Sequence, residues 1–175
     1  MKYFALFSLP VDFNIDLELL NQAYLQLQKA VHPDKYAHKS SAEQLLAVQK
    51  SAQINDALHI LKHPLKRAEY MLSERGIDIR AEQQTLQDPM FLMQQMELRE
   101  ELEDIKEAND PDAAISAFDK QIKKIDLDYH TQLKTLIAQT DIEQLHRTAD
   151  VVRKLKFIYK LREELERVED SLFDD

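Results

Sequence analysis

Hydrophobic side chains recur along this chain at intervals of three and four residues, which is the spacing of amphipathic helices. One stripe predicts a helix over residues 16–31 and consists of Leu20, Tyr24, Leu27 and Val31. A second stripe, of Ala47, Ile54, Leu58 and Leu61, predicts a long helix that begins near residue 40 or 41. Few stretches alternate with the period of two that strands require. The pattern therefore predicts an all-α fold.

Helix boundaries are indicated by prolines and capping residues. Pro33 disfavours helical geometry in the residue before it, so the first long helix must end at Val31 or His32. Ser40 or Ser41, followed by Glu43 or Gln44, resembles a capping box that opens the second long helix. Pro64 closes that helix and stands near the first position of a short one over residues 65–73. Gly76 follows where a C-terminal cap is expected.

The second half predicts three more helices, over residues 88–108, 111–137 and 141 to the acidic tail. Their breaks are Asp88-Pro89 and the segment 109–112. The last helix carries a seven-residue repeat of the kind that packs along neighbouring helices, made of Val151, Ile158, Leu165 and Leu172 with Leu161 and Val168 between them. We therefore expect a helical domain over residues 1–75, a connector over 76–84 and a three-helix bundle over 85–175.

Composition excludes several classes of site. The chain has 175 residues, one glycine and no cysteine. A single glycine excludes the glycine-rich loops that cradle phosphates, and the absence of cysteine excludes thiolate catalysis and cysteine-ligated metals. The apolar start of the chain is too short for a signal peptide, and no stretch of about 18 apolar residues follows. A short buried N-terminal helix and a cytoplasmic protein without a membrane partner are expected.

Charge is divided unevenly between the two halves. Residues 1–80 carry 10 basic and 9 acidic side chains, whereas residues 81–175 carry 13 and 23, within a net charge of −9. Binding to nucleic acid is disfavoured, because phosphate neutralisation needs clustered lysine and arginine. Two modules with different partners are expected instead.

The sharpest local feature is the tripeptide His32-Pro33-Asp34, which lies between the two long helices. Proline fixes its own φ and restricts His32, so the loop is held in one conformation. The tripeptide alone equally suits a helix stop with an aspartate turn. Its context is more specific: aromatic residues Tyr3-Phe4-Ala5-Leu6-Phe7 precede it, and the segments 51–57 and Pro64…Arg67…Tyr70 follow it.

In these motifs residues 1–73 resemble the J domain, the module by which co-chaperones engage DnaK-type ATPases. The resemblance implies a helical hairpin whose loop binds the chaperone. It implies a chaperone-binding set of His32, Pro33, Asp34, Lys29 and Lys35. The chain departs from most J domains in two respects, since Val31 stands where they carry tyrosine and Lys29 is the only cation on a helix that is usually basic.

The helix after Pro89 presents two faces. At 100° per residue from Phe91, a core face of Leu98, Leu102 and Ile105 lies within about 40°. Leu92, Met93 and Met96 fall at about 100°, 200° and 140°, with Glu97, Glu100 and Asp104 at about 240°, 180° and 220°. This second face is either a binding surface or a second buried stripe. Phe157, about 100° from the seam of the last helix, is likewise either an exposed anchor or a packed ring.

A J domain joined to an acidic bundle, with the segments 91–102 and 152–157, resembles the HscB family of iron–sulfur cluster co-chaperones. The resemblance implies an L-shaped, two-domain protein whose J domain stimulates ATP hydrolysis by the chaperone HscA. It further implies that the bundle binds the cluster scaffold protein IscU. The implied scaffold-binding set is Leu92, Met93, Met96, Glu97, Glu100, Asp104 and Phe157. Met96 replaces the more usual leucine, and the two side chains have similar volumes.

Two other functions are alternatives to this one. A general J-protein would need a less selective client surface on the bundle. A metallohydrolase would use His59 and His63, which have the i, i+4 spacing of a helical metal pair but lack the glutamate of HExxH and an obvious third ligand. We expect no catalytic residue, no metal and no cofactor, and we expect a monomer.

Overall fold

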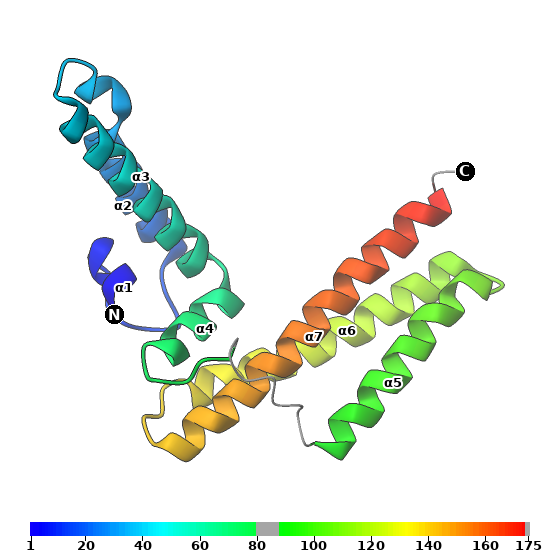
Figure 1. Cartoon of the computed structure of the whole chain (residues 1–175). Coiled ribbons are helices and arrows are strands. Elements are labelled where there is room, and N and C mark those ends of the chain that lie inside the picture. The colour runs from blue at the N-terminus through cyan, green and yellow to red at the C-terminus, as the bar shows by residue number, and fades with distance from the viewer. Residues whose placement is uncertain (80–87, 174–175) are drawn as a thin grey trace. The chain divides into compact units, whose positions relative to one another are not determined.

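The structure, a computed structural model, describes residues 1–79 and 88–173, and all regular secondary structure in these ranges is helical. These ranges contain seven α-helices, two 3₁₀ helices and no strand (Figure 1), which confirms the all-α prediction. The chain divides into two compact units, Met1–Gly76 and Ile77–Asp175. Of the connector predicted over 76–84, the part from residue 80 onward lies outside the described residues.

The first unit is built on a hairpin of two long helices, α2 (Leu17–Val31) and α3 (Ser41–Lys62), which lie side by side in Figure 1. Asp16 caps α2 by accepting hydrogen bonds from the backbone of Glu18 and Leu19. A capping box made by Ser40 and Glu43 opens α3. The sequence had left Ser41 and Gln44 open as alternatives for these two positions. The Ser40 hydroxyl and backbone lower the pKa of the Glu43 carboxyl by hydrogen bonding to it.

Two short helices complete this unit, α1 (Lys2–Leu6) and α4 (Pro64–Ser73). The Tyr3 and Tyr70 rings stack with centroids 4.6 Å apart, and the Tyr3 backbone amide donates to the Tyr70 hydroxyl at 3.0 Å. Phe4 and Phe7 are buried beside them, which confirms the short buried helix expected at the start of the chain. Gly76 follows α4 with φ +88°, a left-handed conformation that glycine adopts without strain.

The second unit consists of α5 (Pro89–Asp104), α6 (Pro111–Leu136) and α7 (Ile142–Phe173). Asp88, Asp110 and Asp141 each accept a hydrogen bond from a backbone amide in the first turn of the helix that follows. The helix predicted to reach Ala108 is α-helical only to Asp104, because its last turn tightens into a 3₁₀ helix, Ile105–Glu107.

The core of this bundle joins all three helices. Leu98 and Leu102 of α5 meet Phe118 and Ile122 of α6 and the seam of α7. The predicted seam residues Ile158, Leu161, Leu165 and Val168 all belong to this cluster, with Leu172 packed at its edge. The seven-residue repeat therefore marks a helix that is buried along most of its length.

Candidate functional sites: the loop of the first unit and the outer face of α5

The His32-Pro33-Asp34 loop is short and internally braced. Pro33 begins a 3₁₀ helix, Pro33–Tyr36, that the sequence analysis did not anticipate. The His32 ring nitrogen Nδ1 accepts a hydrogen bond from the Asp34 backbone amide at 3.3 Å and lies 3.5 Å from the Asp34 carboxylate. Both side chains still face solvent, with 58% of the His32 side chain and 91% of the Asp34 side chain exposed. The loop therefore presents two polar groups in a fixed arrangement.

Both long helices hold this loop in place. The Tyr36 hydroxyl donates to the Ala30 carbonyl of α2 at 3.4 Å. The Gln44 side chain of α3 donates to the carbonyls of Ala37 and Lys39 at 3.3 and 3.1 Å. These bonds lock the tip to the hairpin, so the positions of His32 and Asp34 follow from the fold.

Lys29 and Lys35 flank the loop and are exposed. The outer surface of α2 that leads from Lys29 back to the start of the helix is also exposed. That surface carries Leu25, which is 56% exposed, and the glutamines Gln22 and Gln26. The five residues predicted for chaperone binding thus lie at one end of the hairpin. The α2 surface that adjoins them is close to neutral.

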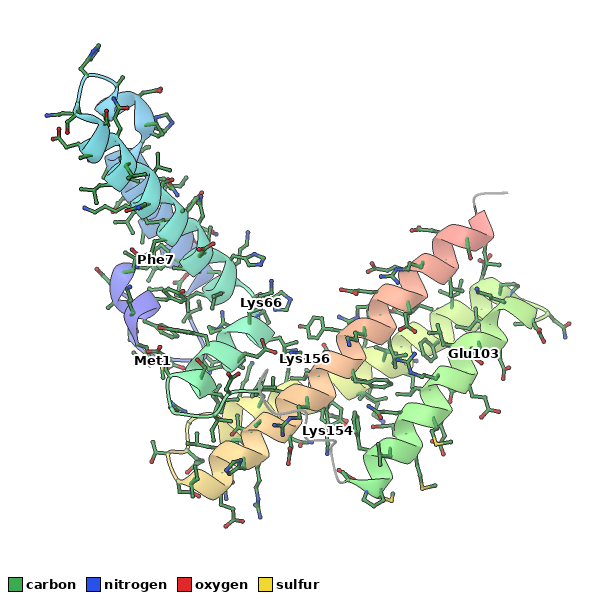
Figure 2. All side chains as sticks on the ribbon, viewed as in Figure 1. Met1, Phe7, Lys66, Glu103, Lys154 and Lys156 are labelled. Carbon is green, nitrogen blue, oxygen red and sulfur yellow. The ribbon has the colours of Figure 1, made fainter. Side chains whose placement is uncertain are left out.

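The acidic and methionine-rich face of α5 is exposed. Leu92, Met93 and Met96 are 40%, 57% and 73% exposed, far above what a buried stripe would show. Figure 2 shows methionine sulfur atoms on side chains that project from α5. Glu97, Glu100 and Asp104 are exposed on the same side of the helix. Of the two interpretations that the sequence left open, the structure supports an exposed surface, while the core face of Phe91, Leu98 and Leu102 is buried.

Phe157 differs from the other predicted members of this surface. Its ring is half-buried, packs against the bundle core and meets Phe91 edge-on at 5.7 Å. The Arg99 guanidinium lies over the ring, 5.3 Å from its centroid, and Arg99 also pairs with Glu164 at 3.1 Å. Phe157 is therefore a packed ring between α5 and α7 with a partly exposed surface, and it does not project as a free anchor.

The start of α5 is fixed by Lys154 of α7 (labelled in Figure 2), which pairs with Asp88 at 2.7 Å. Its ammonium group also lies over the rings of Phe91 and Tyr129, at 5.4 and 5.8 Å. The hydrogen bond from Lys154 is the main cause that lowers the pKa of the Asp88 carboxyl. Burial raises the pKa of Tyr129, whose hydroxyl donates to Gln94 of α5 at 3.0 Å. These contacts set the orientation of the exposed face.

Sequence reasoning missed two neighbours of this face. Met90 is 76% exposed, and the same angular count places it at about 260° from Phe91, beside Glu97, so the pattern contained the signal. Arg99 was missed because its role depends on Phe157 and Glu164, which are about 60 residues away and brought near by packing alone.

The histidine pair His59 and His63 does not form a recognisable metal centre. The Lys66 amine contacts the Nε2 atom of His59, a contact that competes with a metal for that nitrogen. Burial lowers the pKa of His63, with help from the neighbouring cations. Within residues 1–79 and 88–173, no group of three or more potential ligands is close enough to hold a metal ion.

Two further features lie apart from these surfaces. An open cavity of about 560 Å³ lies between α6 and α7, lined by residues that include Thr131, Thr135 and Arg147, and none of its lining residues belongs to either predicted set. Among the helices of the described residues, none is long and apolar enough to cross a bilayer.

Comparison with known proteins identifies both units. Residues 3–70 match the family model of the DnaJ domain, and residues 87–166 match the model described as the HSCB C-terminal oligomerisation domain. Curated relatives named co-chaperone protein HscB homolog include one from Vibrio vulnificus, 52% identical over 99% of both chains. Another, from Photobacterium profundum, is 53% identical over 99% of this chain and all of its own.

Solved structures agree over nearly the whole chain. The chaperone HscB from Vibrio cholerae superimposes with a TM-score of 0.91 at 53% identity, covering 98% of this chain and 99% of its own. The human co-chaperone HscB superimposes with a TM-score of 0.85 at 26% identity, covering 95% of this chain and 81% of its own. With a J domain, an acidic helical bundle and relatives that match it from end to end, this chain belongs to the HscB family of co-chaperones.

Proposed function

We propose that this co-chaperone couples an HscA-type ATPase to an IscU-type scaffold during iron–sulfur cluster assembly. The observation that carries the proposal is the presence in one chain of two exposed surfaces of different chemistry. One is the rigid His32-Pro33-Asp34 loop, and the other is the methionine-rich, acidic face of α5. Neither surface has the enclosed, water-excluding geometry that catalysis by the chain itself would favour.

The exposed groups of the loop have the charges needed to bind the chaperone. Asp34 is nearly fully exposed and held in position, so its carboxylate is available to accept charge-assisted hydrogen bonds from a cationic group on the ATPase. Lys29 and Lys35 add attraction for acidic groups around that cation. Binding that favours the hydrolysis-competent conformation of the ATPase would accelerate hydrolysis in the partner. Since that partner consumes ATP, a cytoplasmic location is part of the proposal.

The α5 face combines apolar and acidic groups that can bind a scaffold protein. Met93 and Met96 are flexible and polarisable, so they adapt to the shape of an apolar partner surface. Glu97, Glu100 and Asp104 border them and select a partner with basic groups at matching positions. The exposed edge of Phe157 extends the apolar part of this surface toward α7. The set implied by the family resemblance therefore forms one surface with a mixed apolar and acidic character.

Carrying both surfaces in one chain raises the effective concentration of the scaffold at the chaperone. ATP hydrolysis would then close the chaperone on the correct client. In this account the chain transfers no chemical group and acts by bringing two partners together.

Calorimetric titration of an IscU-type scaffold into this protein tests the client half of the proposal. Leu92→Ala combined with Met96→Ala should weaken binding by about a hundredfold, because both side chains lose apolar contact area. Ile142→Ala is the matched control, since Ile142 is 61% exposed at the start of α7, and it should leave the affinity unchanged. Unchanged affinity in the double variant, together with equal binding of unrelated unfolded chains, would favour a general J-protein instead.

A further inference from the structure

An open groove of about 260 Å³ lies between the end of α5 and the first half of α6. The residues that line it fall within two segments, from Glu101 to Ala108 and from Ala114 to Gln121. Sites for small-molecule ligands are usually larger, roughly 300–1,000 Å³, and enclose most of the ligand. An open groove of this size fits a single protruding side chain of a protein partner better.

The walls of the groove are apolar and short. Ala114 and Ala117 stand three residues apart on α6, so they lie on the same side of that helix. Ile105 and Phe118 also line the groove, and both belong to the bundle core and are only 3% exposed. The groove therefore offers apolar contact to an aliphatic chain, and a larger side chain at position 117 would fill part of it.

Two carboxylates, Glu101 and Asp104, line the side of the groove that belongs to α5, and both are exposed. They stand three residues apart, so both can reach one cationic group. Among the residues that the structure describes, no ion pair neutralises either of them. A lysine or arginine side chain matches this combination, because it has an apolar stem and a charged end. The groove thus has the shape and charge of a site for a basic side chain.

The groove is continuous with the methionine-rich, acidic face of α5. Asp104 belongs to both, since it lines the groove and is a member of the set predicted to bind the scaffold. Glu97, another member of that set, lies four residues before Glu101, so these carboxylates follow one side of α5. A partner that covers Met93 and Met96 therefore reaches the groove without leaving this surface.

We propose that the groove is a subsite for a lysine or arginine side chain of the scaffold protein. The apolar stem lies against Ala114 and Ala117, and the charged end bonds to Glu101 and Asp104. The side-chain oxygen of Gln121, which is exposed on the α6 side, can accept a further hydrogen bond from the charged end.

Glu101 was not in the predicted scaffold-binding set, and this inference makes it a residue that determines specificity. A partner without a basic side chain at the matching position leaves both carboxylates unpaired, so it binds less tightly. The inference rests on the proposed function, because it states how the α5 face selects its partner.

Filling the groove tests whether a partner occupies it. Ala117→Leu places a larger apolar side chain there, and it should weaken binding of an IscU-type scaffold at least about tenfold in calorimetric titration. Leucine is a good helix former and Ala117 is exposed, so the variant should fold like the wild type, which circular dichroism checks. Ala113→Leu is the matched control, since Ala113 is exposed on α6 outside the groove, and it should bind like the wild type.

Removing charge tests the basic nature of the occupant. Glu101→Gln should weaken scaffold binding several-fold and make the affinity less dependent on salt, because a charge-assisted hydrogen bond is lost. Glu101→Lys should weaken it at least about tenfold, since attraction becomes repulsion. Glu163→Gln, at an exposed position of α7 that does not line the groove, should leave the affinity and its salt dependence unchanged.

The outcomes separate the subsite from the proposed function. Wild-type affinity in Ala117→Leu would overturn the subsite and leave scaffold binding by the α5 face intact. Weak binding by Ala117→Leu with wild-type affinity in both Glu101 variants would overturn the basic occupant in favour of an uncharged one. A wild-type protein that binds no scaffold would overturn the proposed function and the subsite together.

Discussion

The ring of Phe157 meets the ring of Phe91 edge-on, with 5.7 Å between centroids and 87° between planes. Phe91 belongs to the buried face of α5, so this contact joins α5 to α7. The orientation of the opposite, exposed face of α5 depends on it. The Arg99 guanidinium also lies over the Phe157 ring and pairs with Glu164 of α7. Phe157 therefore has a structural role in addition to any contact with a partner.

Phe157→Ala should lower the free energy of unfolding of the bundle by about 2 kcal/mol, below the 3–5 typical of a fully buried phenylalanine because the ring is half-exposed. Leu92→Ala/Met96→Ala should change it by less than about 1 kcal/mol, since both side chains are exposed. Urea unfolding, monitored by circular dichroism, measures the free energy of unfolding of both variants. Equal stability of Phe157→Ala and wild type would contradict the packed position of the ring.

Asp34→Asn should abolish stimulation of the partner ATPase without altering folding. The Asp34 side chain is 91% exposed and its only described polar contacts are with His32 of the same loop, so the folded state loses little when the charge is removed. The measurement is steady-state ATP hydrolysis by an HscA-type chaperone, with thermal unfolding as the check on folding. Asp56→Asn, on the exposed side of α3, is the control that should stimulate normally.

Asp88→Asn should destabilise the bundle at neutral pH and lose its effect in acid. Asparagine still accepts the capping hydrogen bond from Phe91, so the variant removes mainly the ion pair with Lys154. The pKa of Asp88 is lowered in the folded state, so its carboxylate stabilises folding above the ordinary value of 3.8, and this contribution disappears as the pH falls through the lowered value. Melting temperatures of both proteins should converge toward low pH.

Asp141→Asn is the control for Asp88→Asn. Asp141 caps α7 by accepting from Gln144, and no ion pair joins it to another described residue. Its substitution should have a smaller effect on the melting temperature at neutral pH. A pH-independent difference between Asp88→Asn and wild type would show that the ion pair with Lys154 does not stabilise the fold.

Arg67→Met should lower the free energy of unfolding of the J domain by about 2–3 kcal/mol. The guanidinium is buried, donates to the Leu61 carbonyl at 2.6 Å and lies 5.0 Å from the Phe13 ring centroid. Methionine has a similar length but leaves that carbonyl without its donor. Chemical unfolding of the first unit measures the loss, and a change below about 0.5 kcal/mol would contradict this role.

The sequence predicted the helices of this fold well because their boundaries are marked locally. Asp16, Ser40 and Asp88 cap helices at the expected places, and Pro64 begins one. The 3₁₀ turns after Pro33 and Asp104 escaped prediction, since a tightened turn has no hydrophobic period of its own. The core faces of α5 and α7 followed from angular spacing alone.

The candidate surfaces were predictable only in part. Angular spacing separated Leu92, Met93 and Met96 from the core but did not say whether they were exposed, because a helix in a bundle has two neighbours. The packing of Phe157 under Arg99, and the anchoring of Asp88 by Lys154, join positions about 60 residues apart, so no local pattern indicated them. That either surface binds its partner is a prediction that rests on the family resemblance and on the chemistry exposed there.

The most direct test of the coupling is steady-state ATP hydrolysis by an HscA-type chaperone with this protein and an IscU-type scaffold, each added alone and together. The wild-type pair should stimulate hydrolysis more than either component. Asp34→Asn should abolish the contribution of this protein, and Leu92→Ala/Met96→Ala should remove only the part that depends on the scaffold. Absence of stimulation by the wild type, or equal loss of both contributions in the α5 variant, would contradict the account of two separate surfaces acting in one chain.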